Sequence, residues 1–567
     1  MNPSFDTMDS IRADLQPLQT LTDFFYYREK QHPDKLFLRQ PVGDRYIDFT
    51  WGEVGRQARI VANYLNSIGL PPKSNIGILS KNCAHWIIAD IAILLSGHVS
   101  VPFYPTLTRN QLGHVLHHSG CAVLFAGKLD NWQNQKPAVP ADTQCVAFPD
   151  YCALADLSLI QWDDILAQYE PMTDNPRPWP EDLFTIIYTS GTTGNPKGVM
   201  MNYRAMASAI ENTKPMMRHD VQNARFFSYL PLCHVAERNF VEATSIITGG
   251  TIYFTESLET FTKNLTAARP THFLAVPRIW HKFQQAILAK ISQKTIDRLL
   301  RLPILSQILK TQIRQRLGLS EAKLILTGAA PMPVSLIQWF RRLGIAIQEA
   351  YGMTENLGVV SMMPSDKIKD GTVGKAYPGM DIKIDAATSE ILTRAEWLMS
   401  GYYHDPAMTN EVLHDGWLHT GDVGHLDQEG YLQVRGRLRD LYKTSKGEYV
   451  IPTQIEAGFA DNHLIEQVCV MGQTLPQPIA LVVLSDLGRQ NDRRLVKQFL
   501  EETVERLNGN LQRHEQVKKV VIVKDPWTVD NNLVTPTLKI KRNVVEDRYE
   551  AKIAGWYEET EKVIWEA

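Results

Sequence analysis

Cysteine is scarce in this chain, with six residues among 567. The cysteines form no Cys-x-x-Cys pair and stand near no histidine at the spacing of a zinc site, so the sequence offers neither a disulfide framework nor a structural metal site. Free thiols in a reducing compartment are the simplest expectation from this usage. The predicted location is therefore the cytoplasm.

A long apolar run is also missing. The most apolar stretch, residues 86–101, is interrupted by Asp90 and by the Ser-Gly-His at 96–98, so it is too short and too polar to cross a bilayer. We expect a buried helix over residues 84–95 instead. The first 19 residues carry three aspartates and no apolar stretch, and the chain does not end in Ser-Lys-Leu. We therefore expect no secretory, transit or peroxisomal signal.

Neither sign of charge is in excess. The 59 Lys and Arg residues nearly balance the 62 Asp and Glu residues, and the formal charge of −3 lacks the basic excess of nucleic-acid-binding proteins. Hydrophobic residues make up 44% and charged residues 21%, as in an ordinary globular enzyme. The length exceeds what one hydrophobic core usually supports. We expect at least two domains and no nucleic-acid partner.

The most informative stretch is the run Tyr-Thr-Ser-Gly-Thr-Thr-Gly-Asn-Pro-Lys-Gly at residues 188–198. It follows a predicted strand at residues 184–188 and precedes a predicted helix at residues 202–212, so it is the loop between them. Its glycines permit positive φ and close backbone approach, its hydroxyl groups donate hydrogen bonds, and Lys197 adds a mobile positive charge. These properties suit phosphate binding.

Two common phosphate motifs do not fit this run. Lys197 is followed by Gly198 where a Walker A loop has Ser or Thr, and no Gly-x-Gly-x-x-Gly is present. A flexible surface turn is the plain alternative. The run resembles the phosphate loop of the adenylate-forming (AMP-binding) superfamily, which includes acyl-CoA synthetases. The resemblance implies a nucleotide-binding loop made of Thr189, Ser190, Gly191, Thr192, Thr193, Gly194 and Lys197, with Thr189 also beside the metal.

The order of elements agrees with this resemblance. From residue 75 onward, short apolar runs alternate with helix-length segments, which predicts parallel α/β layers, and beyond residue 374 short strands and turns predict a small β subdomain. The predicted fold class is α/β, with a large N-terminal domain of layered α/β subdomains plus the β subdomain. A small mobile C-terminal α+β domain follows. The predicted boundaries are 1–436 and 437–567, and the resemblance implies a hinge near Arg439.

A second motif, residues 351–355, follows a predicted strand at residues 345–348, where an α/β sheet presents its carboxyl edge to ligands. Alone, a Thr-Glu pair is typical of a helix start. The resemblance implies that Tyr351 and Gly352 lie at the adenine, that Thr354 contacts phosphate and that Glu355 holds Mg²⁺. It likewise implies that a third segment borders the adenine and the acid, namely Gly328, Ala329 and Ala330.

Three further segments acquire roles only through the resemblance. Asp422, in what is otherwise an ordinary turn, matches the aspartate that accepts both ribose hydroxyls, and Arg437 matches an arginine that touches the nucleotide. Residues 533–542 could equally be a solvated basic face, but their register selects Lys539 as the active-site lysine and Lys541 as the second choice. The Ser-Gly that often precedes this lysine in the family is replaced by Thr-Leu at residues 537–538.

The resemblance also implies a second step, in which the small domain turns and replaces Lys539 by the loop 443–449. Gly447 would then line the pantetheine tunnel of coenzyme A, with Lys443 nearby, although both also fit an ordinary turn. The implied cofactors and co-substrates are ATP, Mg²⁺ and coenzyme A.

Three stretches, residues 101–108, 230–238 and 276–280, resemble the long-chain and bubblegum-type branch. His234 is then expected beside the acyl carboxylate and Trp280 along the acyl tunnel, although both residue types are commonly found in protein cores. The predicted function is that of a long-chain fatty acid–CoA ligase. A fatty acyl-AMP ligase, an acyl-carrier-protein synthetase and a non-catalytic nucleotide-binding protein are the alternatives. Peripheral membrane contact and homodimer formation stay open.

Overall fold

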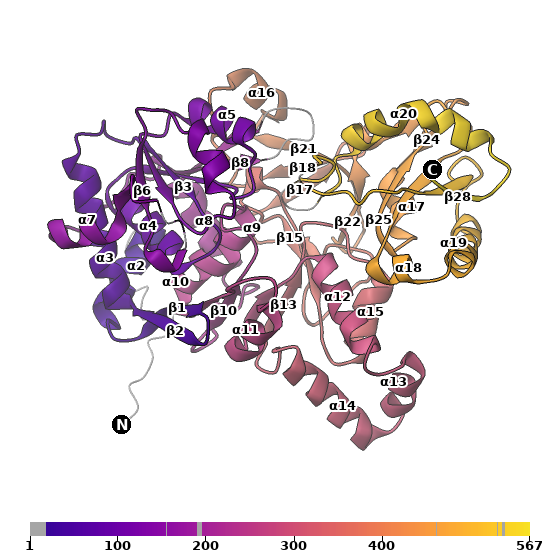
Figure 1. Cartoon of the computed structure of the whole chain (residues 1–567), viewed down its shortest axis with the longest axis horizontal. Coiled ribbons are helices and arrows are strands. Elements are labelled where there is room, and N and C mark those ends of the chain that lie inside the picture. Colours follow the sequence, from indigo (N-terminus) through magenta and orange to yellow (C-terminus); the bar gives the residue numbers. More distant parts are fainter. Residues whose placement is uncertain are drawn as a thin grey trace.

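The computed structural model describes residues 19–566 except positions 153, 155, 190–195, 461, 530 and 536–538, and it does not describe the side chain at position 150. A large body holds the N-terminal and central parts of the chain, and the C-terminal part forms a smaller body beside it (Figure 1). Both bodies mix helices and strands. The predicted fold class is confirmed, whereas the boundary at residues 436 and 437 stays a prediction.

The first sheet of the large domain has eight strands in the order β19-β9-β8-β4-β3-β5-β6-β7. Strands β4, β3, β5 and β6 run parallel. Strands β4 and β5 are buried at every position, which is why they are continuous apolar runs rather than alternating ones. The strand bounds are β3 Asn75–Leu79, β4 Val99–Phe103, β5 Val123–Ala126, β6 Gln144–Ala147, β7 Ile160–Gln161, β8 Leu183–Thr189, β9 Lys197–Asn202 and β19 Gly401–Tyr402.

The second sheet has nine strands in the order β16-β15-β14-β13-β12-β10-β11-β1-β2. Its bounds are β1 Leu36–Val42, β2 Arg45–Thr50, β10 Arg225–Ser228, β11 Thr251–Phe254, β12 His272–Leu274, β13 Leu324–Thr327, β14 Gln348–Tyr351, β15 Ser361–Met362 and β16 Lys375–Ala376. Helix α4, Ala84–Leu95, is buried at every position because it packs against strands of both sheets. The buried helix expected at these residues is therefore confirmed.

Helices cover and connect these sheets. Most have an ordinary amphipathic pattern with one buried side. In chain order, the other helices of the large domain are α2 Leu21–Gln31, α3 Trp51–Ser67, α5 Arg109–Ser119, α6 Trp132–Gln135, α7 Trp162–Gln168, α8 Tyr203–Thr213, α9 Val235–Glu237, α10 Thr244–Thr248, α11 Phe261–Ala268, α12 Pro277–Leu288, α13 Gln293–Leu300, α14 Pro303–Arg316, α15 Val334–Arg342 and α16 Pro406–Val412. In the part of the chain that the structure describes, no helix combines the length and apolarity needed to cross a bilayer.

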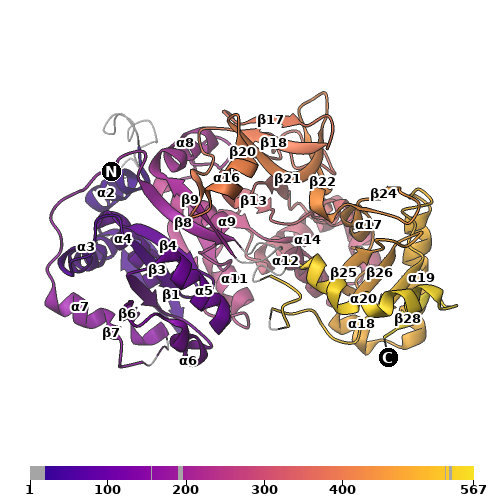
Figure 2. The same ribbon diagram turned by 90° about the horizontal axis from the view of Figure 1, so that it is seen from above.

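A third, five-stranded sheet forms the β subdomain predicted beyond residue 374. Its strands are β17 Asp381–Ile384, β18 Glu390–Arg394, β20 Leu413–His414, β21 Trp417–Leu426 and β22 Leu432–Arg437. The long strand β21 pairs with both β18 and β22. In Figure 2 this sheet lies on the side of the large domain from which the chain continues into the small domain.

The small domain is built on the four-stranded sheet β25-β26-β27-β28. Its strands are β25 Ile465–Met471, β26 Ile479–Leu484, β27 Lys519–Ile522 and β28 Val563–Trp565, and its helices are α17 Pro452–Ala457, α18 Asp486–Gln490, α19 Arg493–Asn508 and α20 Arg542–Glu558. A separate hairpin, β23 Tyr442–Lys443 and β24 Tyr449–Val450, precedes them. The domain mixes strands and helices, as the predicted α+β class requires.

Two predicted boundaries are wrong, and both bear on the site. The glycine-rich run does not lead directly into a helix, because residues 197–202 form strand β9 and pair antiparallel with β8. Gly198 and Pro196 hid this strand, since both residue types are usually depleted in strands. The strand predicted at residues 345–348 begins at Gln348 instead, so that Tyr351 is its last residue rather than one that follows it.

Candidate active site

The centre of the candidate site is a buried carboxylate, Asp422, on strand β21. Tyr351, at the end of β14, donates its hydroxyl hydrogen bond to Oδ2 of Asp422 at 2.6 Å. Arg437, which stands opposite Asp422 in the β21–β22 pairing, places its Nε 2.8 Å from Oδ1. The structure thus brings together three residues that the sequence predicted from separate motifs.

The electrostatics of this centre favour a polar ligand. Burial raises the pKa of Asp422, and the nearby Arg437 and the Tyr351 hydrogen bond partly offset this rise. Burial also raises the pKa of Tyr351 well above its usual value, so its hydroxyl stays a donor at neutral pH. Each carboxylate oxygen has two acceptor positions, so Asp422 can still accept hydrogen bonds from a ligand's hydroxyl groups.

Glu355 forms a second acidic point on a 3₁₀ turn, Thr354–Asn356, and both Thr354 and Glu355 are buried. Its Oε1 accepts a hydrogen bond from the hydroxyl of Tyr402 at 2.7 Å. The ammonium group of Lys197 lies 5.3 Å from the centre of the Tyr402 ring, within cation–π range. Tyr402 therefore connects the acidic turn with the end of the glycine-rich loop, a role that the sequence did not suggest.

Gly352 has a steric reason for its position. A Cβ there would lie 2.2 Å from the carbonyl carbon of Gly358, so the backbone of the turn leaves no room for any side chain. Ala329, after β13, takes a left-handed conformation with φ of 64°, which is uncommon for alanine and costs backbone energy. Gly328 precedes it, and Ala329 and Ala330 are exposed, so these small residues leave an open surface at the carboxyl end of β13.

The glycine-rich loop itself is only partly described. Thr189 and Lys197 pair with each other at the loop end of the β8–β9 hairpin. Ser190, Gly191, Thr192, Thr193 and Gly194 lie outside the described residues. The predicted role of the loop in binding phosphate therefore stays a prediction.

Lys539 reaches this centre from the small domain. A reciprocal pair of hydrogen bonds with Thr535 holds its backbone, with Thr535 N to Lys539 O at 2.7 Å and Lys539 N to Thr535 Oγ1 at 3.0 Å. Lys539 keeps contact with solvent, but the protein crowded around its ammonium group lowers its pKa, and Arg437 lowers it further. Asp422 and Glu355 act in the opposite direction, so all three groups lie within electrostatic reach of Lys539.

Lys541, the second choice for the active-site lysine, points elsewhere. Its ammonium group donates a hydrogen bond to Oδ1 of Asn532 at 2.6 Å, within the small domain. The geometry therefore supports the register that selects Lys539 and not Lys541.

His234 stands at the start of α9, where its Nδ1 accepts a hydrogen bond from the backbone of Ala236 at 3.2 Å. Burial lowers the pKa of His234 to about 3, and the positive charge of Lys539 contributes to this shift. His234 is therefore neutral at physiological pH and lies within the electrostatic reach of Lys539.

Three other predicted residues lie outside this centre. Trp280 is completely buried and packs against Phe273, Phe283 and Phe340, with its indole nitrogen donating to the carbonyl of Ala275 at 3.1 Å. The exposed Lys443 and Gly447 lie in the β23–β24 hairpin, where the Lys443 ammonium is over the Tyr449 ring. The structure does not bring these three residues to Asp422, and their predicted roles stay predictions.

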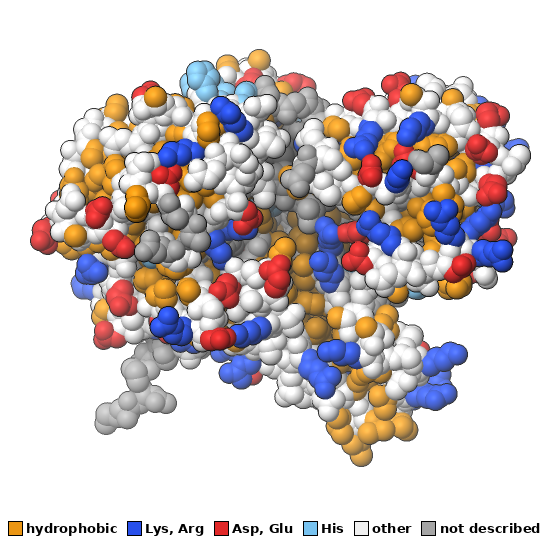
Figure 3. All heavy atoms as spheres, viewed as in Figure 1, with side chains coloured by type: hydrophobic (Ala, Val, Ile, Leu, Met, Phe, Trp, Pro, Cys, Tyr) orange, Lys and Arg blue, Asp and Glu red, His pale blue; other side chains and the backbone are white. Residues whose placement is uncertain are grey.

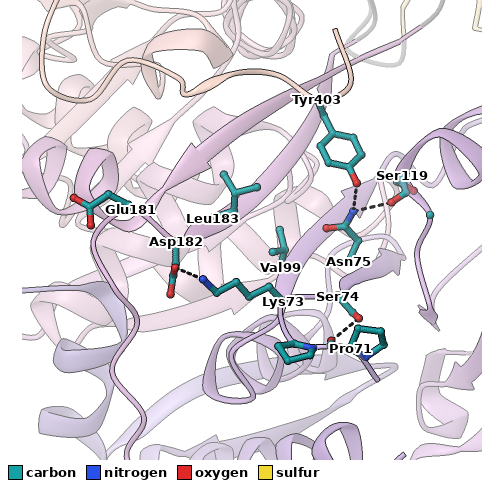
Figure 4. Close-up of a pocket in the computed structure, with 12 residues that line it drawn as sticks. Pro71, Lys73, Ser74, Asn75, Val99, Ser119, Glu181, Asp182, Leu183 and Tyr403 are labelled. Carbon is teal, nitrogen blue, oxygen red and sulfur yellow. Dashed lines mark hydrogen bonds and ion pairs between the residues drawn. The ribbon is translucent and has the colours of Figure 1, made fainter. Parts of the chain in front are cut away.

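The cavity in Figure 4 lies at the opposite edge of the first sheet. It has a volume of about 510 Å³. Its lining includes Asn75, Val99 and Leu183, which are the first residues of strands β3, β4 and β8. Its polar groups already have protein partners, as in the Lys73–Asp182 ion pair at 2.6 Å. Ligands of α/β sheets bind at the carboxyl ends of strands, so this cavity is not the candidate active site.

A buried network that the sequence did not reveal holds the segment leading to His234. Asn82 donates from Nδ2 to Oγ of Ser228 at 2.8 Å and to the carbonyl of Leu230 at 2.6 Å. Glu237 accepts a hydrogen bond from the backbone of Tyr229 at 2.9 Å. Because Asn82 and Glu237 are far apart in the chain, spacing alone gave no sign of their contact.

Glu237 gives this network a measurable pH dependence. Burial raises its pKa from 4.5 to about 8, so the folded state holds a proton that the unfolded state releases within this window. The proton bound by Glu237 stabilises the folded state fully below pH 4.5. As the pH rises from 4.5 to about 8, the free energy of unfolding falls by up to about 1.4 kcal/mol per pH unit, and above pH 8 the contribution is lost. We expect Glu237→Gln to flatten the fall in melting temperature between about pH 6 and about pH 9. Parallel curves for the two proteins would contradict this assignment.

Comparison with known proteins identifies the family. The family model of the AMP-binding enzymes matches residues 25–403, and the model of the AMP-binding enzyme C-terminal domain matches residues 440–561. Fatty acyl-CoA synthetase A of Dictyostelium discoideum is 28% identical, over 95% of this chain and 91% of its own. Long-chain-fatty-acid–CoA ligase FadD15 of Mycobacterium tuberculosis is 27% identical, over 94% of this chain and 96% of its own.

Solved structures show the same fold. The adenylation domain of a carboxylate reductase from Mycobacterium chelonae superposes with a TM-score of 0.81 at 21% identity, over 97% of this chain and 93% of that domain. An anthranilate CoA ligase in complex with anthranoyl-AMP gives a TM-score of 0.77 at 19% identity, over 96% of this chain and 99% of that one. With both domains matched along most of its length, the chain belongs to the AMP-binding enzyme family.

Proposed function

We propose that the protein activates a long-chain fatty acid with ATP to give acyl-AMP and pyrophosphate, and then forms a thioester with coenzyme A. The observation that carries this proposal is the buried cluster of Tyr351, Asp422 and Arg437, which has the charge of Lys539 within electrostatic reach. The names of the relatives, a fatty acyl-CoA synthetase and a long-chain-fatty-acid–CoA ligase, support the choice of acid.

In the first step, the fatty acid carboxylate attacks the α-phosphorus of ATP and pyrophosphate leaves. Asp422 accepts hydrogen bonds from the ribose hydroxyls, while Tyr351 and Arg437 hold its carboxylate in place. Lys539 places a positive charge where negative charge builds on the phosphorus-bound oxygens, and a partly desolvated site strengthens this interaction. Thr354 and the glycine-rich loop add donors. The protein contributes no covalent nucleophile.

The residues present fit Mg²⁺ bound together with ATP. Among the described residues no cluster of three or more His, Cys, Asp or Glu side chains could hold a metal alone. Mg²⁺ commonly takes one or two carboxylates and completes its shell with substrate phosphates and water, so Glu355 with Thr189 is sufficient. When bound, the ion neutralises phosphate charge. Glu355 is held for this task by Tyr402.

In the second step, the thiol of coenzyme A attacks the acyl carbonyl and AMP leaves. Lys539 keeps its charge within electrostatic reach of Asp422 and Glu355 in the present arrangement, and we propose that the thiol enters after the small domain moves. We propose that the movement turns near Arg439 and brings the loop of Lys443 and Gly447 to the site. We propose that His234 lies beside the reacting carboxyl group of the acid; because its Nδ1 accepts from Ala236, the Nε2 of the neutral ring carries the proton and can donate a hydrogen bond without adding charge.

The acceptor thiol distinguishes this proposal from its nearest alternative. A fatty acyl-AMP ligase or acyl-carrier-protein synthetase would use the same residues to form acyl-AMP and then pass the acyl group to a carrier-protein thiol. Palmitate-dependent pyrophosphate exchange followed by palmitoyl-CoA formation supports the CoA ligase. Exchange without palmitoyl-CoA formation favours the alternative, and no exchange with any acid indicates a non-catalytic nucleotide-binding protein.

Chain length is the sharpest test of the proposed acid. Each buried CH₂ contributes about 0.8 kcal/mol, so eight additional carbons provide at most about 6 kcal/mol before entropy is counted. We expect kcat/KM to rise from octanoate to about palmitate and then level off. The KM for ATP should stay nearly constant across the series. Highest activity on acetate or on aromatic acids would contradict the long-chain assignment.

Trp280 provides a companion test of the predicted acyl tunnel. Trp280→Ala should change the chain-length profile more than the KM for ATP if its ring lines the tunnel. Its packing predicts a loss of about 3 to 5 kcal/mol in stability as well. Trp280→Phe keeps most of the packing and serves as the control. An unchanged profile in a folded alanine variant would assign Trp280 to the core alone.

A further inference from the structure

The helical hairpin inserted between β12 and β13 carries an unusual apolar tip. Helix α14 buries one side through Ser306, Leu309 and Ile313. Its other side, with the residue before it, exposes large apolar side chains instead of the polar residues usual on a free helix face. These side chains, 41% to 77% exposed, form what we name the apolar tip: Leu302, Ile304, Leu305 and Ile308.

Exposed large apolar side chains are clustered at the apolar tip more densely than elsewhere on the described surface. In the ranges that the structure describes, no other stretch of seven residues exposes four large apolar side chains. Figure 3 shows them as a continuous orange surface at the lower end of the molecule, at the position of α14 in Figure 1. Contiguous exposed apolar surface costs solubility, so such a patch usually marks a contact with another molecule or a membrane.

Basic residues are concentrated in the same hairpin as the apolar tip. The segment 290–316 contains seven lysines and arginines and a single acidic residue, Asp297, which pairs with Arg342. The basic set is Lys290, Lys294, Arg298, Arg301, Lys310, Arg314 and Arg316. Blue side chains accordingly flank the orange surface on both sides in Figure 3. An exposed apolar tip on a hairpin with an excess of basic residues is typical of a helix that inserts into the interface of an anionic membrane.

We propose that the α13–α14 hairpin docks this protein on the surface of an anionic lipid bilayer. The apolar tip enters the boundary between headgroups and acyl chains, and the exposed members of the basic set, Arg298 and Arg301 above all, contact the lipid phosphates. A second copy of the chain is a poorer partner, because a two-fold contact through this patch would bring the basic residues of the two hairpins together. A bilayer supplies apolar depth and negative charge in one surface.

The test is sedimentation with vesicles of phosphatidylcholine, with and without phosphatidylglycerol, in the absence of acid, ATP and coenzyme A. We expect the protein to bind vesicles that contain phosphatidylglycerol more tightly than vesicles of phosphatidylcholine alone, and we expect its affinity for the anionic vesicles to fall as salt is added. The double variant Ile304→Glu with Ile308→Glu should lose at least about tenfold in vesicle partitioning, since buried apolar area supplies much of the anchoring. The matched control is Leu157→Glu, a change at an exposed leucine elsewhere on the surface.

A charge variant separates the electrostatic contribution to vesicle binding from the apolar contribution. Arg298→Glu with Arg301→Glu should weaken binding to anionic vesicles, at roughly fivefold or more per residue, and should flatten the salt dependence. Melting temperatures of all variants establish that they are folded. The proposal is overturned if the wild type stays in the supernatant, or if the Ile variants bind as the wild type does. Loss of a solution dimer in these variants without any vesicle binding would assign the tip to self-association instead. Because no substrate is present, the result is independent of the proposed fatty acid activity.

Discussion

Replacing Lys539 by alanine should reduce acid-dependent pyrophosphate exchange by about 10²- to 10³-fold, the usual cost of losing one preorganised group that stabilises transition-state charge. The charge of Lys539 lies within electrostatic reach of both Asp422 and Glu355. Conversion of supplied acyl-AMP to acyl-CoA should continue, because that step is proposed to follow removal of Lys539 from the centre. Isotope exchange and acyl-CoA formation measure the two steps separately.

Lys541→Ala is the matched control for this prediction. Lys541 stands two residues away and carries the same charge, but it binds Asn532 in its own domain. The control should keep nearly full pyrophosphate exchange. Normal exchange in Lys539→Ala together with its loss in Lys541→Ala would show that the register of residues 533–542 is wrong. Equal loss in both steps for Lys539→Ala would contradict the proposed movement of the small domain.

The sequence predicted most strands and helices of the fold because their local patterns agree with their final environment. Strands β3 and β4 and helix α4 are apolar along most of their length, since they are covered on both sides by other layers. Strand β9 was missed because its glycine and the preceding proline favour a turn locally. The local sequence of β9 gives no sign of its pairing with β8, and this pairing stabilises it as a strand.

The site residues were predicted as separate motifs, and their convergence needed the structure. Asp422 and Arg437 meet because β21 and β22 pair in a register that no local pattern specifies. Tyr402 was missed because a lone tyrosine carries no motif, although it binds Glu355 from a position 47 residues along the chain. Asn82 was missed for the same reason, since its contact with Leu230 spans 148 residues. Residues such as Tyr402 and Asn82, whose role is to position other side chains, belong to no motif that the sequence would reveal.

Glu355→Gln should raise the Mg²⁺ concentration needed for half-maximal ATP use by about tenfold or more, with a large loss of activity at low Mg²⁺. The amide keeps an oxygen that can accept the hydrogen bond of Tyr402, so the fold of the turn is preserved. The charge that attracts the ion is lost. Activity titrated with Mg²⁺ at fixed ATP, together with the melting temperature, measures the two effects independently.

Tyr402→Phe is the control that separates metal binding from the geometry of the turn. It removes the hydrogen bond to Glu355 but leaves the carboxylate charge and the aromatic face toward Lys197. We expect a smaller shift in the Mg²⁺ titration than for Glu355→Gln, since the ligand is present but less well oriented. An unchanged titration in Glu355→Gln would contradict its role as a metal ligand. A fall in melting temperature with an unchanged titration would assign Glu355 to the structure of the 3₁₀ turn, where its buried carboxylate accepts the hydrogen bond of Tyr402.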